Sequence, residues 1–323
     1  MASDTPYNVA VVGLGIVGSR TIELMRRHPR FSVECAFDLS EEARSIAAQT
    51  FSGVEILPTL EEVFCRDGIH IVYIATPPAA HGDIARMAIG RNWGVFCEKP
   101  LGVDNDDSEK LTAEINAANV AQAINFVFSG APSAHEAEKQ IDAGLIGDIL
   151  GAELILKFSA WPRGWQAGAS WLNEQSQGGM MREVGSHFAH LTKLLIGQPE
   201  VTQWPIIEYP ASGQAETSVM GVWNAGECRV SVNARVGGVR RDIVRYRLLG
   251  TKASMVLEDW YNLILEKPDG EIQLLDPKEA QRQVAYERQL DLLAAQLDDG
   301  EKRRADFNDA LDVQRLIERT LNY

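Results

Sequence analysis

Short apolar runs alternate with longer amphipathic segments over the first 125 residues. The apolar runs are typical of buried strands, whereas the segments between them have apolar positions three and four residues apart, which is typical of helices. Strands are predicted at 9–12, 31–37, 70–76, 93–99 and 121–127, and helices at 19–28, 39–49, 79–92 and 105–120. Alternating strands and helices of this kind predict an α/β domain with a parallel sheet and helices on both faces.

The pattern changes after about residue 129. A helix at 133–148, a strand at 149–160, an aromatic loop at 161–177 and a helix at 178–196 are predicted first. Consecutive strands follow at 217–226, 227–235, 243–250, 253–259 and 271–276, and a largely helical tail runs from 279 to 323. Strands without intervening helices predict an α+β domain with a large, open, mostly antiparallel sheet. We expect the outer face of this sheet to carry Trp223, Val230 and Val232 and to be buried between subunits.

Length and charge narrow the function. A chain of 323 residues exceeds what one core usually supports, and the boundary is predicted at 1–125 and 126–323. The formal net charge of −14 disfavours nucleic acid and anionic membranes as partners. The beginning of the sequence shows no secretory pattern, no segment suits a membrane span, and the four cysteines are scattered, so we expect a cytoplasmic protein.

The glycine spacing GxGxxG stands between the first strand and the first helix. Gly13 would form the tight turn, Gly15 would let the backbone approach a pyrophosphate, and Gly18 would let helix and strand pack closely. Asp38 ends the second strand, where a carboxylate can bind ribose hydroxyls and would repel a 2′-phosphate. The sequence therefore predicts a dinucleotide site that takes NAD in preference to NADP, although Arg44 lies one helical turn beyond Asp38.

Further candidate residues follow the other strands, and ligands of parallel sheets bind at the carboxyl ends of the strands. The predicted cofactor-binding set is Gly13, Gly15, Ile16, Val17, Gly18, Asp38, Thr76, Pro77, Pro78, His81, Glu98, Lys99 and Asn125. A partly buried lysine beside a cationic nicotinamide suits proton transfer near neutral pH, which makes Lys99 a catalytic candidate. Packing or capping of the next helix is the alternative interpretation of His81.

The segment GGMMREVGSHFAH, residues 178–190, places three polar groups on one face of the predicted helix. Glu183, His187 and His190 stand at i, i+4 and i+7, where a helix facing the core would carry apolar residues. The spacing alone is compatible with a metal site, an acid–base pair or a buried polar cluster.

Four motifs together resemble the glucose–fructose oxidoreductase, inositol dehydrogenase and rhizopine-catabolism (Gfo/Idh/MocA) family. They are VVGLGIVG, VYIATPPAAH, FCEKPLG and GGMMREVGSH, and the segments RLLGTKASMVLED and ADFNDALDVQRLIERTLNY are similar to the closing segments of that family. The resemblance implies a Rossmann domain and a second domain with an open sheet. It further implies oxidation of a secondary alcohol of a sugar, polyol or related compound, or the reverse, by homodimers or homotetramers that pair through the sheet.

The same resemblance assigns roles to single residues. Lys99 and His187 match the catalytic lysine and histidine of the family, and a cis bond is predicted between Lys99 and Pro100. Glu183 stands where the family most often has aspartate, and His190 replaces a second acid. We expect catalytic roles for Lys99, Glu183 and His187, and no metal.

Substrate contacts are predicted from the aromatic loop and the following helix. Tryptophan faces suit the C–H faces of sugars, and arginines bind carboxylate or phosphate groups, although plain packing and surface ion pairs would place the same residue types there. The expected set is Lys99, Trp161, Arg163, Trp165, Arg182, His187 and His190, and Trp171 lies in the same loop.

Three other functions fit parts of the sequence. A redox-neutral enzyme with a tightly held NAD would retain its cofactor through purification. A non-enzymatic NAD-binding regulator would not need Lys99, Glu183 and His187. A zinc enzyme built on Glu183, His187 and His190 would contain stoichiometric metal.

Overall fold

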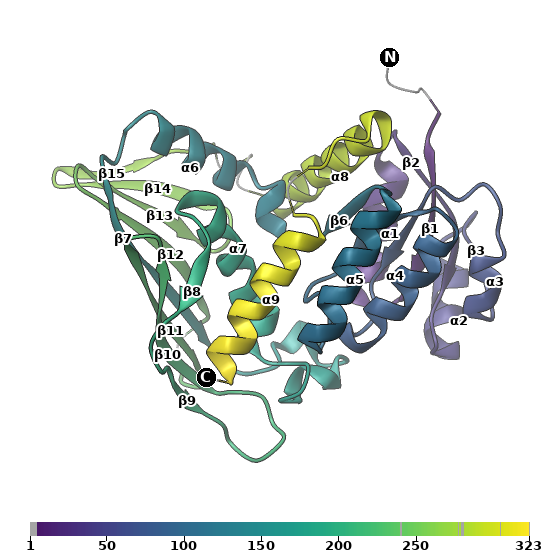
Figure 1. The fold of residues 1–323 in the computed structure, drawn as a ribbon, viewed down its shortest axis with the longest axis horizontal. Coiled ribbons are helices and arrows are strands. Elements are labelled where there is room, and N and C mark those ends of the chain that lie inside the picture. The colour runs from purple at the N-terminus through teal and green to yellow at the C-terminus, as the bar shows by residue number, and fades with distance from the viewer. Residues whose placement is uncertain (1–4, 240, 277, 279–280, 304, 323) are drawn as a thin grey trace. The chain divides into compact units, whose positions relative to one another are not determined.

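The computed structural model describes residues 5–239, 241–276, 278, 281–303 and 305–322. The chain divides into two compact units. The first comprises Met1–Phe126 and Tyr286–Leu311, and the second comprises Val127–Ala285 and Asp312–Tyr323. Each unit has its own sheet (Figure 1).

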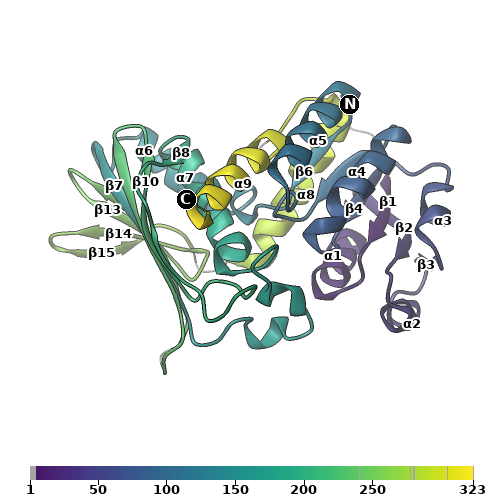
Figure 2. The same cartoon turned by 60° about the horizontal axis from the view of Figure 1, so that its bottom comes forward.

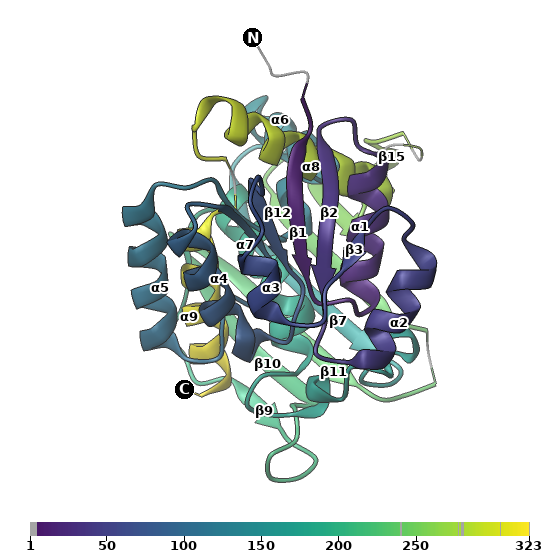
Figure 3. The same cartoon turned by 90° about the vertical axis from the view of Figure 1, so that its right-hand side faces the viewer.

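The first unit is built on a six-stranded parallel sheet of order β3-β2-β1-β4-β5-β6. Its strands are β1 (Tyr7–Val12), β2 (Phe31–Phe37), β3 (Glu55–Ile56), β4 (Ile71–Ile74), β5 (Gly94–Cys97) and β6 (Gln122–Ile124). Its helices are α1 (Ile16–Arg27), α2 (Glu41–Thr50), α3 (Leu60–Phe64), η1 (Pro78–Ala80), α4 (His81–Gly90) and α5 (Asn105–Ala118), and the helices flank the strands in Figure 3. The strand order reverses at β1, so the switch point between β1 and β4 defines the expected ligand edge.

Local sequence signals set the helix starts in this unit. The Ser40 hydroxyl accepts a hydrogen bond from the Ala43 backbone N–H at 3.2 Å, and Glu41 and Glu42 lie in the first turn of α2. Asp104 caps α5 in the same way, through the Asp107 N–H at 2.7 Å. The predicted alternation of strands and helices is confirmed, and the two short elements β3 and α3 add to it.

The helix α8 (Arg282–Asp299) carries the chain back to the first unit. Leu290, Leu293 and Ala294 belong to the same apolar core as Val9 and Ile22. The Gln289 side-chain amide also donates to the carbonyls of Ile124 and Phe126 at 3.3 and 3.4 Å. Residues 286–311 are therefore part of the first unit, unlike the continuous 126–323 domain that the sequence predicted.

The second unit contains a nine-stranded sheet. The order is β15-β14-β13-β12-β7-β11-β10-β8, with β9 paired to β10. Among the described strands of this sheet, only the β7–β11 pair is parallel. The strands are β7 (Ile149–Phe158), β8 (Pro199–Val201), β9 (Ile206–Glu208), β10 (Ser218–Ala225), β11 (Cys228–Val236), β12 (Ile243–Gly250), β13 (Ser254–Glu258), β14 (Asn262–Lys267) and β15 (Gly270–Gln273). The large, mostly antiparallel sheet is confirmed, and β8, β9 and β14 are additional strands.

The helices of the second unit cover one face of this sheet (Figure 2). They are η2 (Val127–Ser129), α6 (Pro132–Asp142), η3 (Gly164–Gln166), η4 (Ser170–Asn173), η5 (Met181–Gly185), α7 (Ser186–Leu195) and α9 (Phe307–Leu321), of which α9 begins in the first unit. The predicted helix 178–196 is observed as a π-helical turn, η5, that continues into the α-helix α7. The first and last residues of the predicted helical tail, 279 and 323, lie outside the described residues.

The apolar residues expected on the outer face of the sheet lie on its inner face. Trp223, Val230 and Val232 are 1%, 0% and 3% exposed within the single chain, and the Trp223 indole N–H donates to the Thr320 hydroxyl of α9 at 3.0 Å. The opposite face carries ion pairs such as Arg247 with Glu266 at 2.6 Å. The expectation was wrong because strand alternation fixes which residues share a face but not which face is covered.

Candidate functional site

The glycine turn after β1 has the geometry that a pyrophosphate cradle requires. Gly13 has φ of +104°, and a Cβ there would overlap the carbonyl group of Ala75. A Cβ at Gly18 would overlap the Gly13 carbonyl, whereas one at Gly15 would meet no atom within 4 Å. Ile16 is exposed and Val17 is half-buried at the start of α1, so the helix N-terminus offers its N–H groups beside open space. These residues fit a bound dinucleotide.

Asp38 is held rigidly at the end of β2. Its carboxylate accepts hydrogen bonds from the backbone N–H of Leu14 at 2.7 Å and of Ser40 at 2.8 Å, which ties it to the glycine turn. Arg44 donates to the carbonyls of Asp38 and Leu39 at 2.7 and 3.1 Å and lies over the Phe37 ring. Both of these hydrogen bonds come from Arg44 Nη1, so the backbone fixes one nitrogen of the guanidinium beside Asp38.

The loop after β4 is fastened to the loop after β5 by His81. Its Nδ1 lies 2.9 Å from the Pro100 carbonyl and its Nε2 lies 2.9 Å from the Thr76 carbonyl. Burial lowers the pKa of His81, and the carbonyl contacts oppose that effect. The side chain is completely buried, so it positions Thr76 and its neighbours Pro77 and Pro78, as the packing interpretation predicted.

Glu98 and Lys99 follow β5 and are both close to the predicted cofactor edge. The Glu98 carboxylate accepts hydrogen bonds from the Tyr73 hydroxyl and from the Asn125 amide, each at 2.5 Å. Burial raises the pKa of Glu98, against the opposing influence of Lys99. Lys99 is 8% exposed, and the bond that joins it to Pro100 is cis, as predicted. Thr21 of α1 donates to the Tyr73 hydroxyl at 3.1 Å, so a buried polar chain joins the helix of the glycine turn to this loop.

In the second unit, a buried carboxylate sets the start of the helix that carries Glu183. Glu216 accepts a hydrogen bond from the Met181 backbone N–H at 2.8 Å, and its own pKa is raised by burial. Gly179, with φ of +101°, lies so close to this carboxylate that a Cβ would overlap it. The glycine is therefore required for Glu216 to cap η5.

Glu183 lies in the π turn, and His187 and His190 lie in α7. A π turn uses hydrogen bonds to the fifth residue, so the four-residue spacing from Glu183 to His187 covers less than one full turn. Glu183 is half-buried and His187 is 8% exposed, whereas His190 is completely buried. His190 therefore occupies a core position, in place of the substrate contact expected from the sequence.

Glu183 is engaged by a network that the sequence did not reveal. The Gln166 side-chain amide donates to Glu183 Oε1 at 2.9 Å and its oxygen accepts from Arg163 Nε at 2.9 Å. The guanidinium of Arg163 is 3.7 Å from Glu183 Oε1. Burial lowers the pKa of Arg163. Because Gln166 is 3% exposed and bonded at both ends of its amide, its orientation is fixed.

The predicted aromatic wall surrounds Arg163. Its guanidinium carbon lies 5.5, 5.7 and 4.9 Å from the ring centroids of Phe158, Trp161 and Trp165. The Trp161 indole N–H donates to the Leu172 carbonyl at 3.0 Å, while Trp165 is 46% exposed. One face of each of these rings is thus occupied by an arginine, and Trp165 retains the greater exposed surface.

Arg182 differs from Arg163 because its guanidinium N–H groups donate hydrogen bonds to carboxylate and carbonyl groups of the second unit. Nε and Nη2 bond the two oxygens of Glu318 at 2.5 and 2.7 Å, and Nη1 bonds the carbonyls of Gln175 and Gly178 at 2.8 and 2.9 Å. Burial opposes the charge, yet the Glu318 hydrogen bonds keep the pKa of Arg182 raised. This arrangement gives Arg182 a structural role in place of the substrate contact expected from the sequence.

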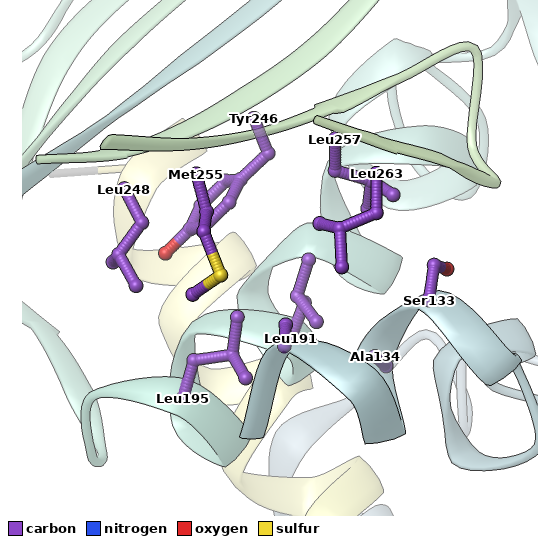
Figure 4. A pocket seen from close by; sticks show the side chains of 10 residues that line it. Ser133, Ala134, Leu191, Leu195, Tyr246, Leu248, Met255, Leu257 and Leu263 are labelled. Atoms are coloured by element: carbon purple, nitrogen blue, oxygen red, sulfur yellow. The ribbon is translucent and has the colours of Figure 1, made fainter. Parts of the chain in front are cut away.

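A small cavity lies between the sheet and the helices α6 and α7, but it does not suit a substrate. Leu191, Leu195, Tyr246 and Met255 point into it (Figure 4), and its volume is about 10 Å³. That volume matches a single water, whereas small-molecule sites usually exceed about 300 Å³. Among the described residues, no group of three or more His, Cys, Asp and Glu side chains is arranged to hold a metal ion.

The topology of the first unit and its glycine cradle define a dinucleotide-binding Rossmann domain. Residues 7–126 match the family model described as "Oxidoreductase family, NAD-binding Rossmann fold" (GFO_IDH_MocA). The match lies within the first unit, so residues 7–126 are similar to the NAD-binding domain of this oxidoreductase family.

Two relatives share less than 30% sequence identity with this chain. Levoglucosan dehydrogenase of Pseudarthrobacter phenanthrenivorans is 28% identical over 40% of this chain and 34% of its own length. The 2,7-anhydro-N-acetylneuraminate hydratase of Escherichia coli is 24% identical over 73% of this chain and 68% of that protein. The alignment with the dehydrogenase thus spans about a third of that relative.

Solved structures share the whole fold. The crystal structure of GenD2 from gentamicin A biosynthesis, in complex with NAD, has a TM-score of 0.81 at 20% identity and covers 97% of this chain and 93% of that one. At this identity the likeness establishes the fold of both units.

Proposed function

We propose that the protein is an NAD-dependent oxidoreductase that transfers a hydride between the nicotinamide and a secondary alcohol or ketone of a sugar, polyol or related small molecule. The observation that carries the proposal is the buried Lys99 after β5, on the sheet whose β1 turn forms the glycine cradle. Parallel sheets bind ligands at the carboxyl ends of their strands, so this lysine belongs to the edge at which a dinucleotide binds.

The dinucleotide, when bound, supplies the hydride acceptor or donor. Gly13, Gly15 and Gly18 would hold its pyrophosphate and Asp38 a ribose, as the open space at Gly15 and the fixed Asp38 carboxylate support. Glu98 and Asn125 line the same edge.

Side chains of the protein would accept and return the proton of the substrate hydroxyl group. Lys99 accepts this proton during alcohol oxidation and returns it during ketone reduction. His187 donates a hydrogen bond to the substrate oxygen, and Glu183, fixed by Gln166, orients or polarises one of these groups. Aromatic and charged side chains of the loop, including Trp165 and Arg163, would contact the substrate.

The preference for NAD follows from two side chains. A carboxylate at Asp38 repels a 2′-phosphate, and Arg44 directs its Nη1 to the carbonyls of Asp38 and Leu39. We propose NAD as the working cofactor, with NADP used poorly.

The test is NAD- and NADP-linked activity of the purified protein across polyols, aldoses, sugar acids and amino sugars. The proposal expects NADH formation with at least one alcohol, and a fall of kcat in Lys99→Ala with NAD affinity retained. Full activity in both Lys99→Ala and His187→Ala would refute the mechanism.

A redox-neutral reaction is the second candidate. The hydratase relative, aligned over 73% of this chain, bears the name of a reaction without net oxidation. Substrate turnover without added NAD, by protein that retains its cofactor through purification, would favour this candidate over the dehydrogenase.

Two further proposals concern the setting of the protein. We propose a cytoplasmic enzyme that forms a homodimer or homotetramer through the open face of the second sheet, on the strength of the family resemblance. Among the described residues, no helix is both long and apolar enough to cross a membrane.

A further inference from the structure

The hairpin between β13 and β14 contains a residue that its backbone does not favour. Asp259 and Trp260 have φ of +47° and +75°, so two consecutive residues are left-handed. Consecutive left-handed residues in hairpin turns are usually Asn, Asp or Gly, because glycine adopts positive φ without strain and Asn and Asp tolerate it. A tryptophan at the second position is an outlier, and such outliers persist only where the surrounding structure requires them.

The indole of Trp260 packs against the helix that carries His187. Its ring centroid lies 5.4 Å from that of the His187 imidazole, with the planes at 79°, and 5.4 Å from that of Phe188. It also stacks on Phe128, at 6.1 Å and 24°. Glycine at position 260 would relieve the backbone but leave this side of the imidazole without a ring. The neighbouring Asp259 has the same strained backbone and an exposed side chain.

The imidazole also contacts the backbone. The Val127 N–H donates to His187 Nδ1 at 3.4 Å. A nitrogen that accepts this bond carries no proton, so the neutral ring is protonated at Nε2. The backbone contact thus sets the tautomer, and the edge-on contact with Trp260 limits rotation of the ring.

We propose that Trp260 is a positioning residue, which holds the His187 imidazole so that Nε2–H donates to the substrate oxygen. The last part of this statement rests on the proposed oxidoreductase function. The orientation and tautomer of His187 do not, because they follow from contacts within the second unit.

The experiment compares Trp260→Gly with Asp259→Gly. Both substitutions relieve a left-handed residue of the same turn, but only the first removes the indole. Misplacement of a catalytic group by about 1 Å lowers rates by about 100-fold, so we expect kcat of Trp260→Gly to fall about 10- to 100-fold while NAD affinity is retained. Asp259→Gly should keep the wild-type kcat, and Trp260→Phe should recover part of the activity.

A readout without turnover separates this proposal from the proposed function. The ¹⁵N chemical shifts of His187, assigned by their loss in His187→Gln, report which ring nitrogen carries the proton. The wild type and Asp259→Gly should show the Nε2–H tautomer. Trp260→Gly should show a mixture of tautomers, because an imidazole that rotates freely loses the Val127 N–H contact that sets the tautomer. If no substrate is turned over by the wild type, the oxidoreductase proposal fails, while the tautomer result still decides the role of Trp260.

A folded Trp260→Gly protein with the wild-type tautomer and, where activity exists, the wild-type kcat would overturn the proposal. If Trp260→Gly does not melt cooperatively, Trp260→Leu replaces it, because leucine fills apolar space without an aromatic plane. The same two readouts then decide: a mixed tautomer with reduced kcat supports the proposal, and wild-type behaviour overturns it.

Discussion

Replacement of Arg182 by alanine should destabilise the second unit strongly and change substrate binding little. Arg182 is 7% exposed, and its guanidinium makes four hydrogen bonds, two with Glu318 and one each with the carbonyls of Gln175 and Gly178. These bonds join the helix η5 and the segment before it to α9.

The magnitude follows from what the substitution leaves behind. The Glu318 side chain is 15% exposed, so alanine at 182 leaves a largely buried carboxylate without its cationic partner, although the Asn322 side-chain amide still donates to it. Removal of one partner of a buried ion pair costs about 3–5 kcal/mol. Since domains are typically stable by about 5–15 kcal/mol, we expect a folded protein with a clearly lowered Tm.

The assay combines thermal unfolding with steady-state kinetics below the transition. Arg182→Ala/Glu318→Ala is the matched control, because it removes both charges. The double variant should be less destabilised than the sum of the two single variants, since the pair acts as a unit. A several-fold increase in substrate KM with an unchanged Tm would refute this reasoning and return Arg182 to the substrate site.

Three further predictions concern the cofactor edge and the Glu183 network. Burial lowers the pKa of His81, so the imidazole binds a second ring proton less readily in the folded protein than in the unfolded chain. The contribution of neutral His81 to the free energy of unfolding should therefore be complete above about pH 6.5 and decline below it. Plots of Tm against pH should therefore be flatter below about pH 6.5 for His81→Gln than for the wild type, and parallel plots would contradict the prediction. Gln166→Leu should lower kcat by about 10-fold, and a double-mutant cycle with Glu183→Gln should be non-additive because one hydrogen bond joins the two side chains; strict additivity would remove the proposed coupling. Asp38→Asn should weaken NAD binding and narrow the preference over NADP, measured by titration with both cofactors, and an unchanged ratio would contradict the role of the carboxylate.

The sequence predicted the first unit well because its signals are local. Apolar runs, the glycine spacing and Asp38 each depend on a few neighbouring residues, and the structure places them as predicted. Tyr73 was also recognisable, since it is the one polar-tipped residue in the buried strand Ile71–Ile74. Its bond to Glu98, 25 residues away, was not.

Long-range packing accounts for what the sequence did not predict. Three features depend on contacts between segments far apart in the chain. They are the packing of α8 on the first core, the covering of one face of the second sheet by α9, and the hydrogen bonds between Arg182 and Glu318. Gln166 and Trp260 gave no signal, because neither has a motif and each acts through a contact with another element. The π turn at η5 also altered the spacing that a regular helix implies for Glu183 and His187.

Hydride transfer at the edge that carries Lys99 can be followed directly with a deuterated substrate. An alcohol that the enzyme turns over is supplied with deuterium on the reacting carbon, together with NAD, and the reduced cofactor is analysed by mass spectrometry. We predict one deuterium in the nicotinamide for the wild type and no labelled product for Lys99→Met, which should still bind NAD. Consumption of the deuterated alcohol without any label in the cofactor would contradict hydride transfer to the nicotinamide.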